Sequence, residues 1–180
     1  MADAYRIKDP FRAYYITLTV IDWVDVFTRK DYRDILIDSL QYCMREKGLQ
    51  MYEFVIMSNH AHLIMASDKV PLPDILRDFK KFTAKKIIEA IIHGNESRKE
   101  WMLKKFAFAG NRNSNNTNYQ FWQQDYHAVE LSTKKMWDQR VQYIHNNPVR
   151  AGIVENVEDY VYGSARFYYG RKCLLELSLV

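Results

Sequence analysis

The stretch that most constrains the fold of this chain is FVIMSNHAHLIM, residues 54 to 65. Two apolar runs rich in strand-forming residues meet at Ser58-Asn59, which is typical of a hairpin with a tight turn. Because so short a turn leaves no room for a crossover, the two strands must be antiparallel. His60 and His62 follow the turn, and residues two apart on a strand share one face, about 6.6 Å apart along the chain.

This histidine pair has two interpretations. Two imidazoles on one face of a strand can converge on a single divalent cation. They can equally be hydrogen-bonded side chains near a sheet edge, because a half-buried imidazole needs a partner for each ring nitrogen. A histidine-triad phosphate enzyme would need a third histidine at position 64, and Ile64 excludes that class. The pair alone does not decide between the two interpretations.

A second motif lies eighty residues further along the chain, in QYIHNNPVRAGIV, residues 142 to 154. Tyr143 and Asn147 are four residues apart, so on a helix they share one face, about 6 Å apart in rise. The phenol could attack a phosphate while the carboxamide completes the ligand shell of a metal. Pro148 cannot continue a regular helix, so we expect Asn147 to lie at a fraying helix end.

Together, MSNHAHLIM and YIHNNPVRAGIV resemble the motifs of HUH single-strand DNA transposases, in particular the REP-associated tyrosine transposases. The resemblance extends from about residue 14 to residue 169. It implies that His60 and His62 are metal ligands, Asn147 the third ligand and Tyr143 the nucleophile. One tyrosine stands on this helix face, which indicates single-tyrosine chemistry.

The implied function is metal-dependent cleavage and strand transfer of single-stranded DNA at hairpin or repeat sequences. A tyrosine nucleophile forms a 5′-phosphotyrosine and frees a 3′-hydroxyl, which can later attack in reverse. Free tyrosine has a pKa of about 10 and is about 0.1% ionised at neutral pH, so a metal must polarise the phosphate. Two neutral histidines and one carboxamide suit Mg²⁺ or Mn²⁺, whereas closed structural zinc sites usually have four ligands, often cysteines.

Two other functions fit the same residues. One is a domesticated hairpin-DNA-binding protein with a role in regulation or repair. The other is a metal-dependent phosphodiesterase in which Tyr143 merely binds substrate and no covalent intermediate forms. The DNA sequence recognised is left open, and a homodimer is possible.

Positive charge is concentrated in one third of the chain. Residues 68 to 112 hold 11 Lys and Arg against 6 Asp and Glu, a surplus larger than the net charge of +4. A local basic face is the electrostatic feature expected of a protein that binds the DNA backbone, although a solvated helix face has the same composition. The expected DNA contacts are Lys80, Lys81, Lys85, Lys86 and Arg150.

The order of predicted elements is strand, helix, hairpin, helix, strand, helix, which predicts a ferredoxin-like sandwich: a four-stranded antiparallel sheet with packed helices. The 180 residues are expected to form one domain. Residues 95 to 120 are expected to be irregular, with a mobile loop or insertion at the polar stretch 111 to 118. The remaining elements are a strand at 14–21, a helix from a Thr28 capping box to Gly48, a helix between Pro71 and Gly94, a strand at 126–131 and a helix capped by Ser132.

The cysteines and the N-terminal sequence bear on location. Cys43 and Cys173 form no CxxC motif, which suits a reducing cytoplasm. The first twelve residues have no apolar signal core, and no segment approaches eighteen apolar residues. We therefore expect a cytoplasmic protein that does not cross a membrane.

Overall fold

The computed structural model describes residues 6–113 and 118–179, and its centre is one antiparallel sheet. The strands are β1 (Tyr14–Thr19), β2 (Leu49–Ile56), β3 (His60–Ser67) and β4 (His127–Glu130), in the order β2-β3-β1-β4. With its packed helices this is the ferredoxin-like sandwich, so the predicted fold class is confirmed. The predicted hairpin is β2 and β3, joined at Ser58-Asn59.

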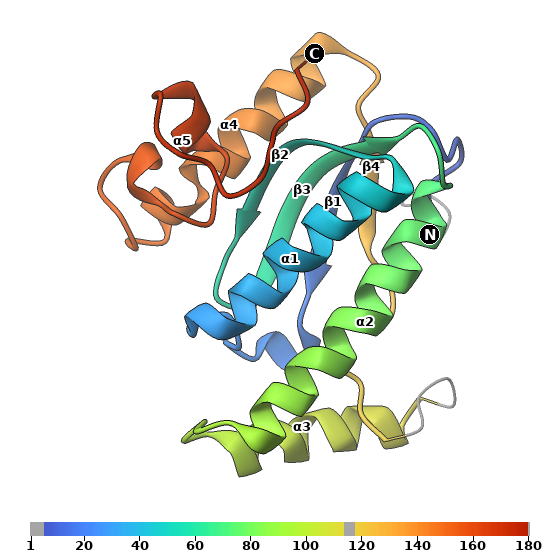
Figure 1. The fold of residues 1–180 in the computed structure, drawn as a ribbon, viewed down its shortest axis with the longest axis vertical. Coiled ribbons are helices and arrows are strands. Elements are labelled where there is room, and N and C mark those ends of the chain that lie inside the picture. Colours follow the sequence, from blue (N-terminus) through green and yellow to red (C-terminus); the bar gives the residue numbers. More distant parts are fainter. Residues whose placement is uncertain (1–5, 114–117, 180) are drawn as a thin grey trace.

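Helices cover both faces of the sheet. In Figure 1, α1 (Lys30–Lys47) and α2 (Leu72–His93) lie side by side in front of it, and α3 (Lys99–Asn111) crosses the lower end of α2. On the opposite face lies α4 (Lys134–Arg150). Because side chains alternate along a strand, β1 buries Tyr14, Ile16 and Leu18 on the side of α1 and α2. Its other side chains, Tyr15 and Thr17, face α4.

The structure confirms some of the predicted helix ends and contradicts others. Helix α1 ends at Gly48, whose φ of 71° lies in the left-handed region that favours glycine. The predicted capping box at its start is wrong. Arg29 is the residue before the first helical turn and gives no side-chain cap, whereas the Thr28 hydroxyl donates to the carbonyl of Asp25 at 3.4 Å. Helix α2 begins directly after Pro71, as predicted.

Two further segments differ from the prediction, and a third lies mostly outside the described residues. Strand β1 stops at Thr19, because a short 3₁₀ turn, η1 (Ile21–Trp23), follows it. Residues 99–111 form α3 where an irregular segment was expected, since Met102 and Phe106 are fully buried there. The predicted loop at 111–118 falls largely on residues 114–117, which lie outside the described part.

Helix α4 also differs from its prediction at both ends. Thr133, not Ser132, caps it, because the Thr133 hydroxyl accepts from the backbone N–H of Met136 at 3.2 Å. The helix continues through Pro148 to Arg150. Pro148 is buried next to Ile144, so packing outweighs the loss of one helical hydrogen bond, and Asn147 lies within the helix.

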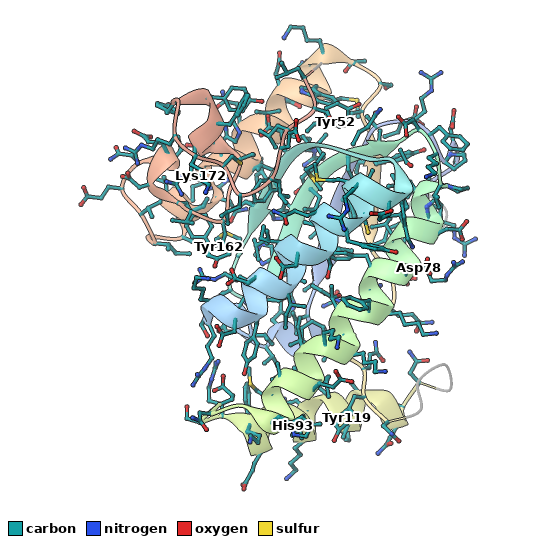
Figure 2. The ribbon with its side chains drawn as sticks, viewed as in Figure 1. Tyr52, Asp78, His93, Tyr119, Tyr162 and Lys172 are labelled. Carbon is teal, nitrogen blue, oxygen red and sulfur yellow. The ribbon has the colours of Figure 1, made fainter. Side chains whose placement is uncertain are left out.

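The C-terminal segment covers the edge of the sheet at β2. It contains η2 (Val157–Asp159) and α5 (Ala165–Tyr168), and its backbone bonds that strand through Tyr162 and Ser164. The hydroxyl of Tyr162, a residue labelled in Figure 2, donates to Asp34 near the start of α1 at 2.6 Å. A covered edge offers no free strand for pairing with another chain. None of the helices in the described residues is long and apolar enough to span a membrane.

Candidate active site

His62 is the most deeply placed polar side chain of the candidate site. Strand pairing sets it opposite Thr17, and it is 5% exposed. Its Nδ1 atom lies 2.8 Å from the Tyr15 hydroxyl and 3.0 Å from the Thr17 hydroxyl. Its Nε2 atom is buried and has no hydrogen-bond partner among the described residues. The tautomer with its proton on Nδ1 avoids a buried, unpaired N–H and leaves the Nε2 lone pair available.

His60 is oriented by its neighbour Asn59. The amide nitrogen of Asn59 donates to Asp25 at 2.9 Å and to the carbonyl of Trp23 at 3.2 Å, which directs its oxygen to His60. The His60 Nδ1–H donates to that oxygen at 2.7 Å. The ring centroids of His60 and His62 are 4.7 Å apart. Both imidazoles are therefore held through Nδ1, which leaves Nε2 as the free coordinating atom of each.

Burial keeps both imidazoles neutral. Burial, together with the neighbouring His60 and Arg140, lowers the pKa of His62 to about 3. Burial also lowers the pKa of His60, against an opposing effect of the Asp25 carboxylate. Burial raises the pKa of Tyr15 to about 12, so its hydroxyl keeps its proton. Neutral imidazoles are the form that binds metals.

Helix α4 places Tyr143 against this pair. The Tyr143 ring centroid lies 5.1 Å from that of His62 and 6.4 Å from that of Tyr15, in edge-to-face contacts. Tyr143 is 37% exposed, so solvent and a ligand can reach it. Arg140, one turn earlier, lies 4.6 Å from the centre of the Tyr15 ring, and Arg150 lies 5.8 Å from that of Tyr143. One guanidinium group thus lies over the ring of Tyr143, and another over the ring of Tyr15, which contacts Tyr143.

A buried carboxylate fixes α4 to the sheet. Glu53 on β2 is 1% exposed and accepts hydrogen bonds from the hydroxyls of Ser164 and Tyr168. The Nε2 atom of His145 on α4 lies 2.8 Å from the same carboxylate. Breaking a buried pair of this kind is strongly destabilising. His145, two residues after Tyr143, therefore anchors the helix that carries the tyrosine.

The residues present fit a divalent metal. The unpaired, buried Nε2 of His62 is the observation in favour, since a lone pair aimed away from every hydrogen-bond donor is available to a cation. Among the described residues no group of three His, Cys, Asp or Glu could hold a metal. A third protein ligand beside the two histidines would therefore be of another residue type. Asn147, half-buried and one turn from Tyr143 on the same face of α4, meets that requirement.

The predicted DNA-contact lysines lie on the other layer of the molecule, on α2. Lys81, Lys85 and Lys86 are exposed, and the last two lie near Glu89 at 3.9 and 3.5 Å. Lys80 is instead half-buried and donates to the carbonyls of Gln123 and Gln124 at 2.8 and 2.9 Å. Burial lowers the pKa of Lys80 to about 8. Its ammonium group is therefore engaged within the fold.

Residues that the sequence motifs did not predict also shape the site. Tyr15 and Thr17 position His62, and nothing in their local sequence indicates this, because it depends on the register between β1 and β3. The contact of Asn59 with His60 is easier to infer from the sequence, since Asn59 directly precedes His60. Arg140 lies three residues before Tyr143, a spacing that places both side chains on one helix face.

Comparison with known proteins identifies the family of this chain. The model of the IS200-like transposase family matches residues 12–110, more than half of the chain. The chain belongs to the IS200-like transposase family and is a DNA-processing protein of the transposase type. The matched residues include the histidine pair and end before Tyr143.

Two solved structures are similar to this chain, and the first covers nearly all of it. A REP-associated tyrosine transposase bound to a REP hairpin has a TM-score of 0.66 and 16% identity, covering 99% of this chain and 92% of that chain. A candidate transposase from Deinococcus radiodurans R1 has a TM-score of 0.48 and 20% identity, covering 78% and 94%. At these identities the likeness shows the fold alone. The search of curated proteins gave no match.

Proposed function

We propose that this protein is a metal-dependent endonuclease and strand transferase for single-stranded DNA, acting through a covalent 5′-phosphotyrosine on Tyr143. The observation that carries the proposal is the contact of the Tyr143 ring with His62, whose Nε2 is unpaired. A nucleophile and a coordinating nitrogen thus lie side by side. One chain supplies both, so the proposed chemistry needs no residue from a second subunit.

Each residue has a defined part in the proposed reaction. His60 and His62, through Nε2, and Asn147, through its amide oxygen, would hold Mg²⁺ or Mn²⁺. When bound, the metal would polarise the scissile phosphate. Arg140 and Arg150 would donate hydrogen bonds to phosphate oxygens of a strand bound at Tyr143, since guanidinium groups match phosphate geometry.

The proposed step is a transesterification. The Tyr143 hydroxyl loses its proton to solvent, and its oxygen bonds to phosphorus. The bond from phosphorus to the 3′ oxygen breaks, and that oxygen takes up a proton as the leaving 3′-hydroxyl. The phosphodiester energy is kept in the phosphotyrosine, so attack by a 3′-hydroxyl reverses the step and joins DNA.

The covalent intermediate supplies the direct test. Incubating the protein with Mn²⁺ and a radiolabelled single strand that carries a hairpin should give a protein–DNA adduct that survives denaturing electrophoresis. The peptide bearing the nucleotide should contain Tyr143, and the released fragment should end in a 3′-hydroxyl. Turnover without any adduct would instead support a phosphodiesterase with no covalent intermediate.

We also propose that hairpin DNA contacts the exposed lysines of α2. The REP-associated transposase of similar fold is bound to a hairpin, which makes hairpin DNA the first substrate to test. In this chain, Lys81 has no ion-pair partner among the described residues, while Lys85 and Lys86 both lie near Glu89. Arg150, beside Tyr143, would contact the strand at the cleavage site.

Replacing Lys81 and Lys85 with alanine should weaken hairpin binding for all sequences alike. Removing one lysine from a DNA phosphate should reduce the slope of log affinity against log salt by about 0.7 to 0.9, so we expect a total change of about one to two units. Sequence preference should survive, because lysine–phosphate contacts carry no sequence information. Titration of labelled hairpin DNA at several salt concentrations measures both quantities.

The matched control is Lys69→Ala with Lys172→Ala, which removes the same charge from exposed positions elsewhere. Lys172 lies on the C-terminal segment, as Figure 2 shows. Stability should change by less than about 0.5 kcal/mol in both double variants. Equal salt slopes and affinities for the wild type and the α2 variant would rule out these lysines as backbone contacts.

A further inference from the structure

Trp23 is an exposed aromatic residue next to the proposed metal ligands, held in an unfavourable backbone conformation. Its indole is 58% exposed and lies edge-on to His60, with ring centroids 5.9 Å apart. The φ angles of Asp22 and Trp23 are 51° and 55°. A bulky side chain in the left-handed region is a genuine outlier, and such strain gathers at functional sites.

The surrounding structure holds the Trp23 turn in place. The Trp23 N–H donates to the carbonyl of Val20 at 3.1 Å, and the Trp23 carbonyl accepts from Asn59 at 3.2 Å. Ile21 N–H donates to the carbonyl of Phe121 at 2.8 Å. Asn59 is also the residue that orients His60. The turn is thus tied to the histidine pair, yet no packing requirement explains a large aromatic residue here, because the indole is exposed.

A shallow groove begins at this indole. Trp23 lines a hollow of about 470 Å³ together with Gln123, Gln124 and Asp125. The last three residues also line a second hollow, of about 550 Å³, which reaches Thr17 and His127 on the face of the sheet that carries His62. The two hollows share Gln123, Gln124 and Asp125 as lining residues, and the second is also lined by Arg6.

The chemistry of the Trp23 hollow favours a nucleobase over a phosphate. Its lining residues, all within the described chain, include no Lys or Arg. Its apolar lining is the indole and Ile21, and its polar lining is carboxylates, which accept hydrogen bonds, and glutamine amides, which both donate to and accept from base edges. The Asp22 carboxylate is paired with Lys105 at 3.3 Å. Two guanidinium groups suited to phosphates lie over other rings: Arg140 over Tyr15 and Arg150 over Tyr143.

We propose that Trp23 is a base-stacking residue and that the hollow beside it, at Gln123 and Gln124, receives an unpaired nucleobase next to the scissile phosphate. The inference rests on the proposed function and deepens it, because it names a specificity pocket for the single strand. Stacking is sequence-tolerant, since every base has a π face. The neighbouring amides would then supply preference for particular bases.

The test measures binding in place of cleavage, so that it is independent of the proposed chemistry. All variants are made in a Tyr143→Phe background and titrated, with chelator present, against fluorescent random-sequence 12-nucleotide single strands. Trp23→Gly should weaken binding by about 5- to 150-fold, the range that one stacked base contributes. Trp23→Phe should retain most of the affinity. Trp101→Ala, which removes a tryptophan of similar exposure (49%) from α3, is the matched control and should bind like its parent.

Glycine is chosen at position 23 because it adopts a positive φ without strain. Trp23→Gly should therefore unfold at the same temperature as its parent or higher, which excludes misfolding as the cause of weak binding. Unchanged affinity in Trp23→Gly, or an equal loss in Trp101→Ala, would overturn the proposal. Failure of the proposed function would appear separately, as the absence of a Tyr143 adduct in the otherwise wild-type protein.

A second measurement tests the base pocket. Selection of bound strands from the random pool should show a base preference at one position for the wild-type pocket. Gln123→Leu keeps the size of the side chain and removes its amide, so that preference should disappear with little loss of affinity. The same preference in both proteins would contradict a role for the Gln123 amide in reading the base.

Discussion

Tyr143→Phe is expected to abolish cleavage of single-stranded DNA, by about 10³-fold or more, while hairpin affinity stays within about twofold. The substitution removes only the hydroxyl that would attack phosphorus. The ring remains, and with it the contacts with His62 and Tyr15 that hold the side chain in place. Denaturing electrophoresis of the labelled adduct and a binding titration measure the two effects on the same preparation.

Tyr15→Phe is the informative control, because the two tyrosines face the same histidine. The Tyr15 hydroxyl is 2.8 Å from His62 Nδ1, so its loss should loosen the ligand without removing the nucleophile. Removing a hydrogen-bond partner of a metal ligand typically costs about 10- to 100-fold in metal affinity or activity. Adduct formation should thus persist in Tyr15→Phe at raised Mn²⁺. Undiminished adduct in Tyr143→Phe would refute the assignment of the nucleophile.

The sequence was most informative where geometry is local. Spacings of two on a strand and four on a helix depend only on the backbone, so the pairs His60 with His62 and Tyr143 with Asn147 could be placed in advance. The resemblance then joined the two motifs, and the structure brings Tyr143 to His62. Their roles as ligands and nucleophile remain predictions.

The sequence was least informative where tertiary contacts decide. Phe82 lies three residues after the buried Phe79, a spacing that predicts a buried position on α2, yet it is 52% exposed. Thr83 takes the buried position instead, because its hydroxyl donates to the carbonyl of Phe79 at 2.7 Å and accepts from the indole of Trp122 at 3.0 Å. A buried polar residue needs its hydrogen-bond partners in place, and one partner of Thr83, the Trp122 indole, lies on another segment of the chain.

The same limit applies around the candidate site. Thr17 contacts His62 only because of the register between β1 and β3, which no local pattern in either strand reveals. Helix α3 was missed although Met102 and Phe106 are spaced for one face, since the polar stretch after it suggested a loop. Trp23 carried no signal either, because its positive φ arises from hydrogen bonds to Val20 and Asn59.

The second prediction with a large expected effect is that cleavage of single-stranded DNA requires a divalent metal. Chelation should stop cleavage, and added Mg²⁺ or Mn²⁺ should restore it, since the phenol needs a polarised phosphate to attack. Metal binding itself can be followed without activity, by titration calorimetry or by the electron paramagnetic resonance signal of Mn²⁺. One ion should bind per chain. His62→Ala should weaken this binding by about 100-fold or more, because it removes a proposed ligand together with the hydrogen bonds that orient it.

Two further substitutions separate a ligand from a neighbouring side chain. Asn147→Ala should weaken Mn²⁺ binding by about tenfold or more, the loss typical of a disturbed metal shell. His127→Ala should leave binding unchanged, although His127 pairs with Thr17 on the same face as His62. If Mn²⁺ instead bound weakly to surface carboxylates and imidazoles in general, the two variants would lose affinity to the same extent. Mn²⁺ bound as tightly by His62→Ala as by the wild type would show that the histidine pair holds no metal, and its unpaired nitrogen would then need another partner.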